Sequence, residues 1–334
     1  MSIPRSRESS PVIEGDERDD GVIGRGFGVQ SEAVGARSAE EVDPGRSAHR
    51  GEAVFSVVRV ALIMVAAIAI GILLNLTLIG RIEQSATQFK ELSQFRYALV
   101  AGTAPISPVQ AHHQPLALGT PLALLTIPSI GLKEVVDEGT NSQVLIAGPG
   151  HLPSTVFPGG LGTSVIYGRA SMYGGPFARV PQLHQGARIL VTMQAGPTNT
   201  VVFRVTDIRT GGQKIPPISA GGARLTLVTA KESMFVPSGV VYVDAKIVGT
   251  PLPTRAPVVT TKRLPADELP MGVDTGDLWV LALWLMALAA FVIGGIWTWH
   301  RRGHVQAWII FTGPLLLIGY FVANQMAVAL PNLM

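Results

Sequence analysis

Hydrolysis or group transfer without a cofactor needs a nucleophile and a neighbouring base, and few residues of this sequence could fill those roles. The 334 residues include no cysteine, which excludes disulfides, thiolate metal sites and a cysteine nucleophile. The hydroxyl candidates in the centre of the chain are Ser171, Thr229 and Ser233, and the imidazoles beyond residue 118 in that region are His151 and His184. Each hydroxyl would need an imidazole within hydrogen-bond reach, and such a pair is the enzymatic alternative that stays open.

The acidic residues show no spacing typical of a metal or phosphate site. Asp137-Glu138 and Asp207 do not form a calcium-loop pattern, and neither an HExxH motif nor a P-loop is present. The sequence therefore predicts no metal and no cofactor. The net charge is +3, but the basic residues are scattered and no basic patch is interleaved with aromatic residues, so nucleic acid is not expected as a partner.

The composition is too apolar for an ordinary soluble protein, with 47% hydrophobic and 15% charged residues. Residues 54–80 supply the roughly 20 apolar residues needed to cross a bilayer, and no small-x-small cleavage site follows them, so we interpret them as an uncleaved signal anchor. Two further apolar stretches, residues 278–299 and 307–330, predict a helical hairpin, because only the short basic segment 300–306 separates them.

Charge predicts the orientation of these spans. The positive-inside rule places the loop 300–306 in the cytoplasm. Residues 1–53 are polar and lack periodicity, and they are expected to form a disordered cytoplasmic tail. Three spans then predict a multi-pass protein of the plasma membrane, with the central region and the C-terminal end on the extracytoplasmic side.

The central region, residues 119–250, is typical of a mostly-β domain. It carries short β-branched runs separated by Gly and Pro, and about 130 residues suffice for one core. The candidate strands are residues 122–127, 164–167, 188–193, 201–208, 224–229 and 240–248.

Two connecting segments flank this domain. Residues 81–118 predict a juxtamembrane amphipathic helix and a linker, with Ile82, Ala86 and Phe89 on one apolar face together with Leu92. This face is expected to pack on its own domain, and a partner helix is the alternative. Residues 251–277, rich in Pro, Thr and charge, predict a second linker.

Several short motifs of the β-rich region occur in an order that is found in one enzyme family. They are Ile-Pro at 127–128, Val-x-x-Gly at 136–139, Gly-Pro-Gly-His at 148–151, Pro-Gly at 158–159 and Leu-Thr-Leu-Val-Thr at 225–229. Together they resemble the sortases, the membrane-anchored cysteine transpeptidases of Gram-positive bacteria. The resemblance implies an eight-stranded β-barrel with short helices over about residues 124–249, and it does not extend to the last two spans.

The resemblance also implies where chemistry would take place. Sortases use a cysteine thiolate as nucleophile, a histidine for proton transfer and an arginine that stabilises the oxyanion. These three positions hold Ala230, Arg169 and Val240, respectively. A methyl group cannot attack a carbonyl, and a guanidinium with a pKa above about 12 cannot serve as a base near neutrality. We therefore expect a pseudoenzyme.

The same positions are the candidates for binding. Arg169 could pair with a carboxylate of a partner at the mouth of a former peptide groove, or it could be an ordinary surface arginine. Thr229 and Lys231, on either side of Ala230, are the other candidate binding residues, although Thr229 should point to the opposite face of its strand.

The leading hypothesis is a catalytically inactive, extracytoplasmic binding or scaffolding subunit of a cell-envelope membrane complex. Its partner would be a membrane protein that contacts the hairpin and the barrel. The alternatives are a sortase-type transpeptidase or hydrolase with a non-cysteine nucleophile, and a module that binds sorting-signal peptides without cleaving them. The resemblance, with the abundance of Ala, Gly and Val, favours a Gram-positive, actinobacterial source.

Overall fold

The computed structural model describes residues 44–109, 114–194, 199–213, 215–218, 220–231, 238–254, 256–257 and 259–334. Most of the expected disordered tail lies outside these ranges, but its last part does not. Helix α1 (Pro44–Leu74) begins at Pro44 rather than at residue 54, because the fixed φ of proline suits the first helical position. It continues through a π-helical turn, η1 (Asn75–Ile79), into α2 (Gly80–Ala101).

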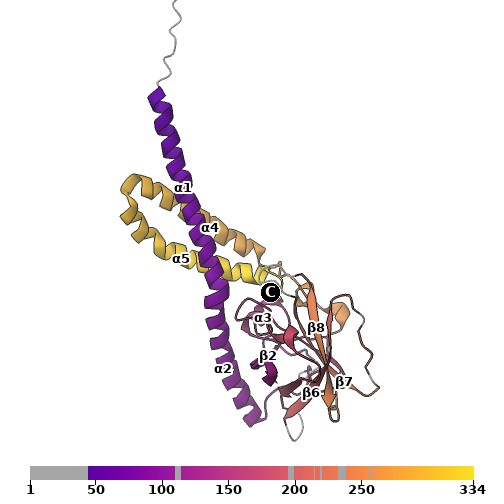
Figure 1. Cartoon of the computed structure of the whole chain (residues 1–334). Coiled ribbons are helices and arrows are strands. Elements are labelled where there is room, and N and C mark those ends of the chain that lie inside the picture. The colour runs from indigo at the N-terminus through magenta and orange to yellow at the C-terminus, as the bar shows by residue number, and fades with distance from the viewer. Residues whose placement is uncertain are drawn as a thin grey trace, which may run out of the picture. The chain divides into compact units, whose positions relative to one another are not determined.

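The centre of the chain is a closed eight-stranded barrel, which confirms the predicted fold class (Figure 1). The strand order is β1-β2-β3-β4-β7-β8-β6-β5. All six predicted strands are present, and β2 and β3 were not predicted. The bounds are β1 (Pro121–Ile127), β2 (Leu132–Glu138), β3 (Gly150–His151), β4 (Gly162–Tyr167), β5 (Arg188–Thr192), β6 (Thr200–Thr210), β7 (Ala223–Ala230) and β8 (Val240–Val248).

Short helical turns connect the strands. They are η3 (Pro128–Ile130), α3 (Ser142–Ala147) and η4 (Val180–Gln182) within the barrel, and η5 (Thr261–Arg263) and η6 (Ala266–Glu268) in the linker that follows β8.

All side chains of strand β7 are buried. Since successive side chains of a strand point to opposite sides, β7 is covered on both of its faces. Leu225 and Leu227 belong to the interior core of the barrel. Val228 and Ala230 belong to a second cluster on the outer face of the barrel wall, whose buried members are Leu145, Tyr167, Val228, Ala230 and Leu333. We call this second group the outer cluster.

The last two helices form the hairpin that the hydropathy predicted. Helix α4 (Leu278–Arg302) and helix α5 (His304–Ala329) are separated by Gly303 alone. The expected loop 300–306 is therefore mostly helical, because only Gly303, with a φ of +96°, interrupts the backbone. Gly295 lies near the first helix, and a Cβ there would be in ordinary van der Waals contact with the Met64 side chain at 3.7 Å.

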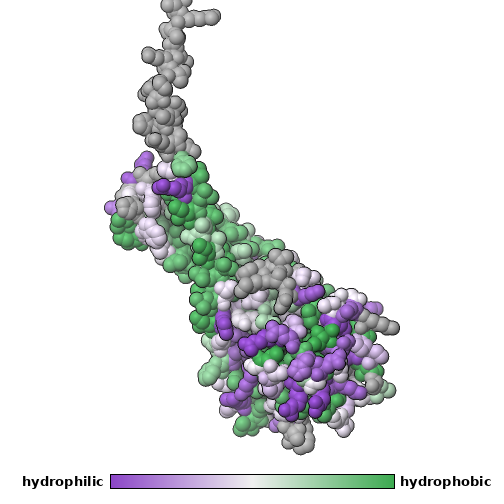
Figure 2. All heavy atoms as spheres, in the orientation of Figure 1, coloured by the Kyte–Doolittle hydropathy of each residue, from purple (hydrophilic) through white to green (hydrophobic). Residues whose placement is uncertain are grey.

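Within the described ranges, three helices are long and apolar enough to cross a membrane. They contain Val58–Ala101, Leu278–Trp299 and Val305–Ala329. Figure 2 shows hydrophobic residues along these helices, whereas hydrophilic residues are frequent on the visible face of the barrel. These features fit a membrane protein with a water-facing β-domain.

Helix α2 buries Gln84, Gln88 and Phe95 rather than the predicted apolar face. Gln88 accepts a hydrogen bond of 2.6 Å from the Val135 amide and donates to the Val135 carbonyl at 3.3 Å. Ile82 and Phe89 are instead 65% and 76% exposed, so the expected packing of the apolar face on its own domain is wrong. The reason is that β2 pairs with β3 only at Asp137 and Glu138, so the amide and the carbonyl of Val135 need another partner. The Gln88 side chain supplies both the acceptor and the donor.

Candidate functional site at the strand ends

The structure brings together the three positions that the family motifs single out. Strand β4 runs parallel to β7, and the amide of Gly168, just beyond β4, donates a hydrogen bond of 3.0 Å to the Val228 carbonyl. Ala230 ends β7 and pairs with Val240, the first residue of β8. Arg169 follows Gly168 and so lies beside these strand ends. We call Arg169, Ala230 and Val240 the strand-end site.

Two of these side chains make the strand-end site apolar. Ala230 is part of the outer cluster, and Val240 packs against it. Neither side chain carries an atom that can attack a carbonyl or exchange a proton. The site therefore offers hydrophobic contact where β7 and β8 meet.

The residues on either side of Ala230 differ in access. Thr229 pairs with Val241, a member of the interior core, and it is fully buried with no hydrogen-bond partner for its hydroxyl among the residues that are described. The expectation that Thr229 binds a ligand is therefore corrected, because its side chain points into the barrel. Lys231 is exposed, and its amide donates a hydrogen bond of 2.8 Å to the Gly239 carbonyl.

Arg169 is fully buried, at 0% exposure, so neither a surface position nor an open groove mouth describes it. Its Nη2 donates to the carbonyls of Ser142 at 3.1 Å and Ala327 at 3.3 Å. The guanidinium also lies 5.6 Å from the ring centroid of Tyr173. Burial lowers the pKa of Arg169 to about 10, which leaves the guanidinium charged at neutral pH.

The remaining donors of Arg169 make its burial costly. Its Nε and Nη1 have no hydrogen-bond partner in the described part of the chain, and no carboxylate forms an ion pair with it there. A charge without a counter-ion in the interior is unfavourable by several kcal/mol. The two carbonyls and the tyrosine ring offset part of this cost.

The strand-end site is covered by the five residues that follow α5. In this 330–334 segment, Leu333 is 0% exposed and belongs to the outer cluster with Ala230. The Ala170 amide donates a hydrogen bond of 2.9 Å to the Leu333 carbonyl, and the Ser142 hydroxyl donates one of 3.2 Å to the Leu330 carbonyl. Side chain and main chain of the segment are therefore both bound.

Asn332 fixes the 330–334 segment to two other parts of the chain. Its Nδ2 donates to the carbonyls of Thr140 at 2.8 Å, Asp267 at 3.0 Å and Leu269 at 2.9 Å. Its own amide donates to the Gly272 carbonyl at 3.0 Å. The segment is thereby held between the loop after β2 and the linker that precedes α4.

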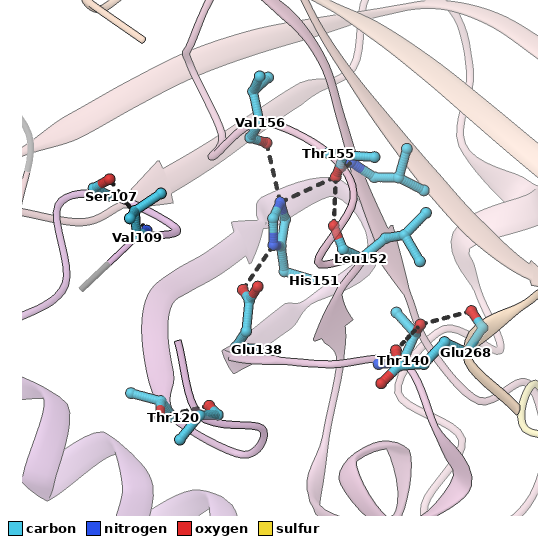
Figure 3. A network of polar contacts seen from close by, with 12 residues as sticks. Ser107, Val109, Thr120, Glu138, Thr140, His151, Leu152, Thr155, Val156 and Glu268 are labelled. Carbon is cyan, nitrogen blue, oxygen red and sulfur yellow. Dashed lines mark hydrogen bonds and ion pairs between the residues drawn. The ribbon is translucent and has the colours of Figure 1, made fainter. Parts of the chain in front are cut away.

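A second contact holds the same loop and linker together. The Glu268 carboxylate accepts hydrogen bonds of 2.5 Å from both the amide and the hydroxyl of Thr140 (Figure 3). Burial raises the pKa of Glu268. Thr140 therefore joins β2 to both Glu268 and Asn332.

A buried network around His151 has the residue types of an acid, a base and a hydroxyl (Figure 3). The Nδ1 of His151 lies 2.8 Å from the Glu138 carboxylate. Its Nε2 lies 3.0 Å from the Val156 carbonyl and 3.2 Å from the Thr155 hydroxyl. A carbonyl oxygen can only accept, so Nε2 carries a proton and has no lone pair for the Thr155 hydroxyl. That hydroxyl donates instead to the Leu152 carbonyl at 2.8 Å.

The position of His151 separates it from the strand-end site. His151 pairs with Ile166, which belongs to the interior core, whereas the next residue along, Tyr167, belongs to the outer cluster. Paired residues of an antiparallel ladder point to the same face. His151 therefore lies on the opposite side of the barrel wall from Ala230 and supports the fold from within.

Comparison with known proteins identifies the barrel. Residues 125–247 match the family model of the sortase domain. Residues 125–247 therefore form a sortase domain. No curated protein matches the chain.

Several solved sortases resemble this sortase domain. Clostridium perfringens sortase D5 transpeptidase is 21% identical, the match covers 49% of this chain and 99% of that one, and the TM-score is 0.39. SrtF sortase from Corynebacterium diphtheriae is 19% identical over 49% and 98% of the two chains, with a TM-score of 0.36. Sortase E from Streptomyces avermitilis is 23% identical over 42% and 93%, with a TM-score of 0.33.

The other hydroxyl and imidazole candidates of the sortase domain do not meet. Ser171 is partly buried and makes no hydrogen bond to an imidazole within the described ranges. His184 is exposed in a turn, and Ser233 lies outside the described residues. Among the described residues, no three His, Asp or Glu side chains gather as a metal site.

Sequence reasoning missed the residues that cover the strand-end site. Asn332 and Leu333 follow an apolar helix and carry no motif, so no signal in the sequence connects them to Ala230. Tyr173, five residues after Gly168, was also not singled out. The sequence does contain a signal for the contact between Glu138 and His151. Glu138 is a carboxylate inside the Val-x-x-Gly motif, and His151 ends the Gly-Pro-Gly-His motif that follows it.

Proposed function

We propose that this protein is a catalytically inactive sortase-family membrane protein that acts as a binding or scaffolding subunit on the extracytoplasmic side of the cell envelope. Its barrel would present a protein-binding surface, and its hairpin would contact a membrane protein partner. In this orientation the N-terminal segment and the turn at Gly303 face the cytoplasm, as the basic residues at the end of α4 favour.

One observation carries the proposal of inactivity. At the positions where the family motifs place histidine, cysteine and arginine, the strand-end site has a buried guanidinium, a methyl group and an isopropyl group. None of these can attack a carbonyl or accept a proton near neutrality. The imidazole of His151 lies on the other face of the barrel wall, so it offers no substitute base.

A transpeptidation assay tests the proposal. The purified full-length protein in mild detergent is incubated with a sorting-signal peptide and hydroxylamine, and an active sortase serves as the positive control. We expect no cleavage and no hydroxamate. Turnover that persists in the Thr155→Val variant would point to another hydroxyl, and turnover lost in that variant would establish a threonine-dependent enzyme; either result refutes inactivity.

The scaffolding role has a separate test. The tagged protein is purified from its native membrane and its partners are identified by mass spectrometry with a stoichiometry estimate. We expect a near-stoichiometric membrane protein that is lost when α4 is replaced by an unrelated apolar helix of equal length. Recovery of the protein alone would contradict a scaffolding role.

A further inference from the structure

The strand-end site is occupied by this chain's own 330–334 segment. Leu333 is fully buried in the outer cluster that also contains Ala230. We propose that the 330–334 segment is an intramolecular ligand of the strand-end site, which locks the barrel to helix α5 and excludes any other peptide from this place while it is bound. This inference goes beyond the proposed function and does not depend on the identity of a membrane partner.

The contacts have the character of a built binding site. Leu333 is an apolar anchor in apolar surroundings, since β7 and β8 contribute Ala230 and Val240 rather than polar catalytic groups. The main chain of the segment is bound as well, through the Ala170 amide and the Ser142 hydroxyl. Burying a leucine fully favours the bound state, and the hydrogen bonds fix its register.

Arg169 has a specific place in this arrangement. Its guanidinium bridges Ser142, at the start of α3, and Ala327, in the last turn of α5. The carbonyls at the C-terminal end of a helix carry partial negative charge, so a buried cation there stabilises the helix end that leads into the segment. Arg169 is therefore a positioning residue for the bound segment rather than a contact for an external carboxylate.

The side of the segment nearest the membrane helices is also packed. Met334 is 5% exposed and shares a cluster with Leu76 of η1 and with Tyr173. The Tyr173 hydroxyl donates a hydrogen bond of 3.1 Å to Asn324 of α5. An external peptide could reach Ala230 only after Leu333 and Met334 had left these positions.

Thiol accessibility tests the inference, and the absence of native cysteines makes each introduced thiol unique. Three single variants of the full-length protein are compared in membranes: Thr229→Cys inside the barrel, Ala230→Cys under Leu333 and Lys231→Cys at the exposed position. Each is labelled with a membrane-impermeant maleimide, with and without Leu333→Asp. We expect Lys231→Cys to react fast in both backgrounds and Thr229→Cys slowly in both.

The informative comparison is Ala230→Cys. Its labelling should be slow in the otherwise unchanged chain and about tenfold or more faster with Leu333→Asp, because a buried carboxylate expels the segment. Equal rates at residue 230 in the two backgrounds would overturn the inference. If Thr229→Cys also becomes reactive, the barrel has opened, and the milder Leu333→Ala replaces Leu333→Asp with the same expected order of rates. The readout needs neither a partner nor a peptide, so it can fail while the scaffolding role stands.

Discussion

Replacing Asn332 with aspartate changes one NH2 group to an oxygen and should release the 330–334 segment. In the native chain that NH2 group faces three carbonyls, those of Thr140, Asp267 and Leu269, at 2.8, 3.0 and 2.9 Å. Asn332→Asp points a buried carboxylate at three acceptors that it cannot satisfy. Asn332→Ala is the milder control, because it removes the donors without adding a charge.

The magnitude follows from the number of donors. An amide NH2 has two hydrogens, so the three contacts amount to two full hydrogen bonds, one of them shared. At about 1 kcal/mol net for each bond, Asn332→Ala should weaken docking by about 2 kcal/mol, and the carbonyls left unpaired increase the loss. Every 1.4 kcal/mol is a factor of ten, so the undocked fraction should rise by about 30-fold in Asn332→Ala and by more than about 100-fold in Asn332→Asp.

Residue-resolved amide hydrogen exchange measures this effect. The Ala170 amide donates to Leu333 and becomes exposed when the segment leaves, whereas the Gly168 amide donates to Val228 inside the barrel and should keep its protection. We expect exchange at Ala170 to accelerate in the order native, Asn332→Ala, Asn332→Asp. If Ala170 stays as protected in Asn332→Asp as in the native chain, or if Gly168 loses protection equally, the docking role assigned to Asn332 is refuted.

Three further predictions concern other contacts of the barrel. Burial, with the nearby charge of Glu91 as a smaller cause, raises the pKa of Asp137 to about 9. The folded state therefore keeps a proton that the unfolded state loses above about pH 4, and the stability of the protein should fall as the pH rises towards 9. Thermal unfolding measured at pH 5 and pH 8 should show a smaller decline in stability for Asp137→Asn than for the native chain. A Cβ at Gly148 would lie 2.1 Å from Nε2 of Gln88, so Gly148→Ala should displace the Gln88 side chain. The free energy of unfolding in denaturant should fall by about 1–3 kcal/mol, and adding Gln88→Ala should lower it little further. Additive losses in the double variant would contradict the shared contact. The triple variant with Arg169→His, Ala230→Cys and Val240→Arg loses the positioning contacts of Arg169, so occlusion is tested by comparison: its transpeptidation should be slower with Leu333 intact than after Leu333→Asp is added, and equal turnover in the two would contradict occlusion.

The sequence predicted the strands that are rich in branched residues, and it failed where charged residues are buried. Residues 240–248 were predicted as a strand with the bounds that β8 has. Strand β2 was missed because Lys133, Glu134, Asp137 and Glu138 obscure its pattern. The partners of these charged residues come from other parts of the fold: Gln84 donates to Glu134, and His151 contacts Glu138. A local sequence pattern does not include residues that are so far apart in the chain.

The candidate site was only partly predictable for the same reason. Motif order located Arg169, Ala230 and Val240, and the structure places them at adjacent strand ends. The burial of Arg169 depends on what covers it, and that cover comes from α3 and the end of α5. Solvent access at one residue is a property of the assembled fold, so residue type alone suggested a surface arginine.

Because the 330–334 segment and the barrel belong to one chain, they meet at an effective concentration rather than at a bulk one. Strand β8 ends at Val248, a linker follows it, and the helical hairpin begins at Leu278. The hairpin returns the chain to the barrel at Leu330. Tethered partners of this kind face each other at concentrations of about a millimolar, although each contact alone is weak. A free peptide with the same intrinsic affinity would have to exceed that concentration to replace Leu333, whereas a pull on α5 by another membrane protein could vacate the site with no competing peptide at all.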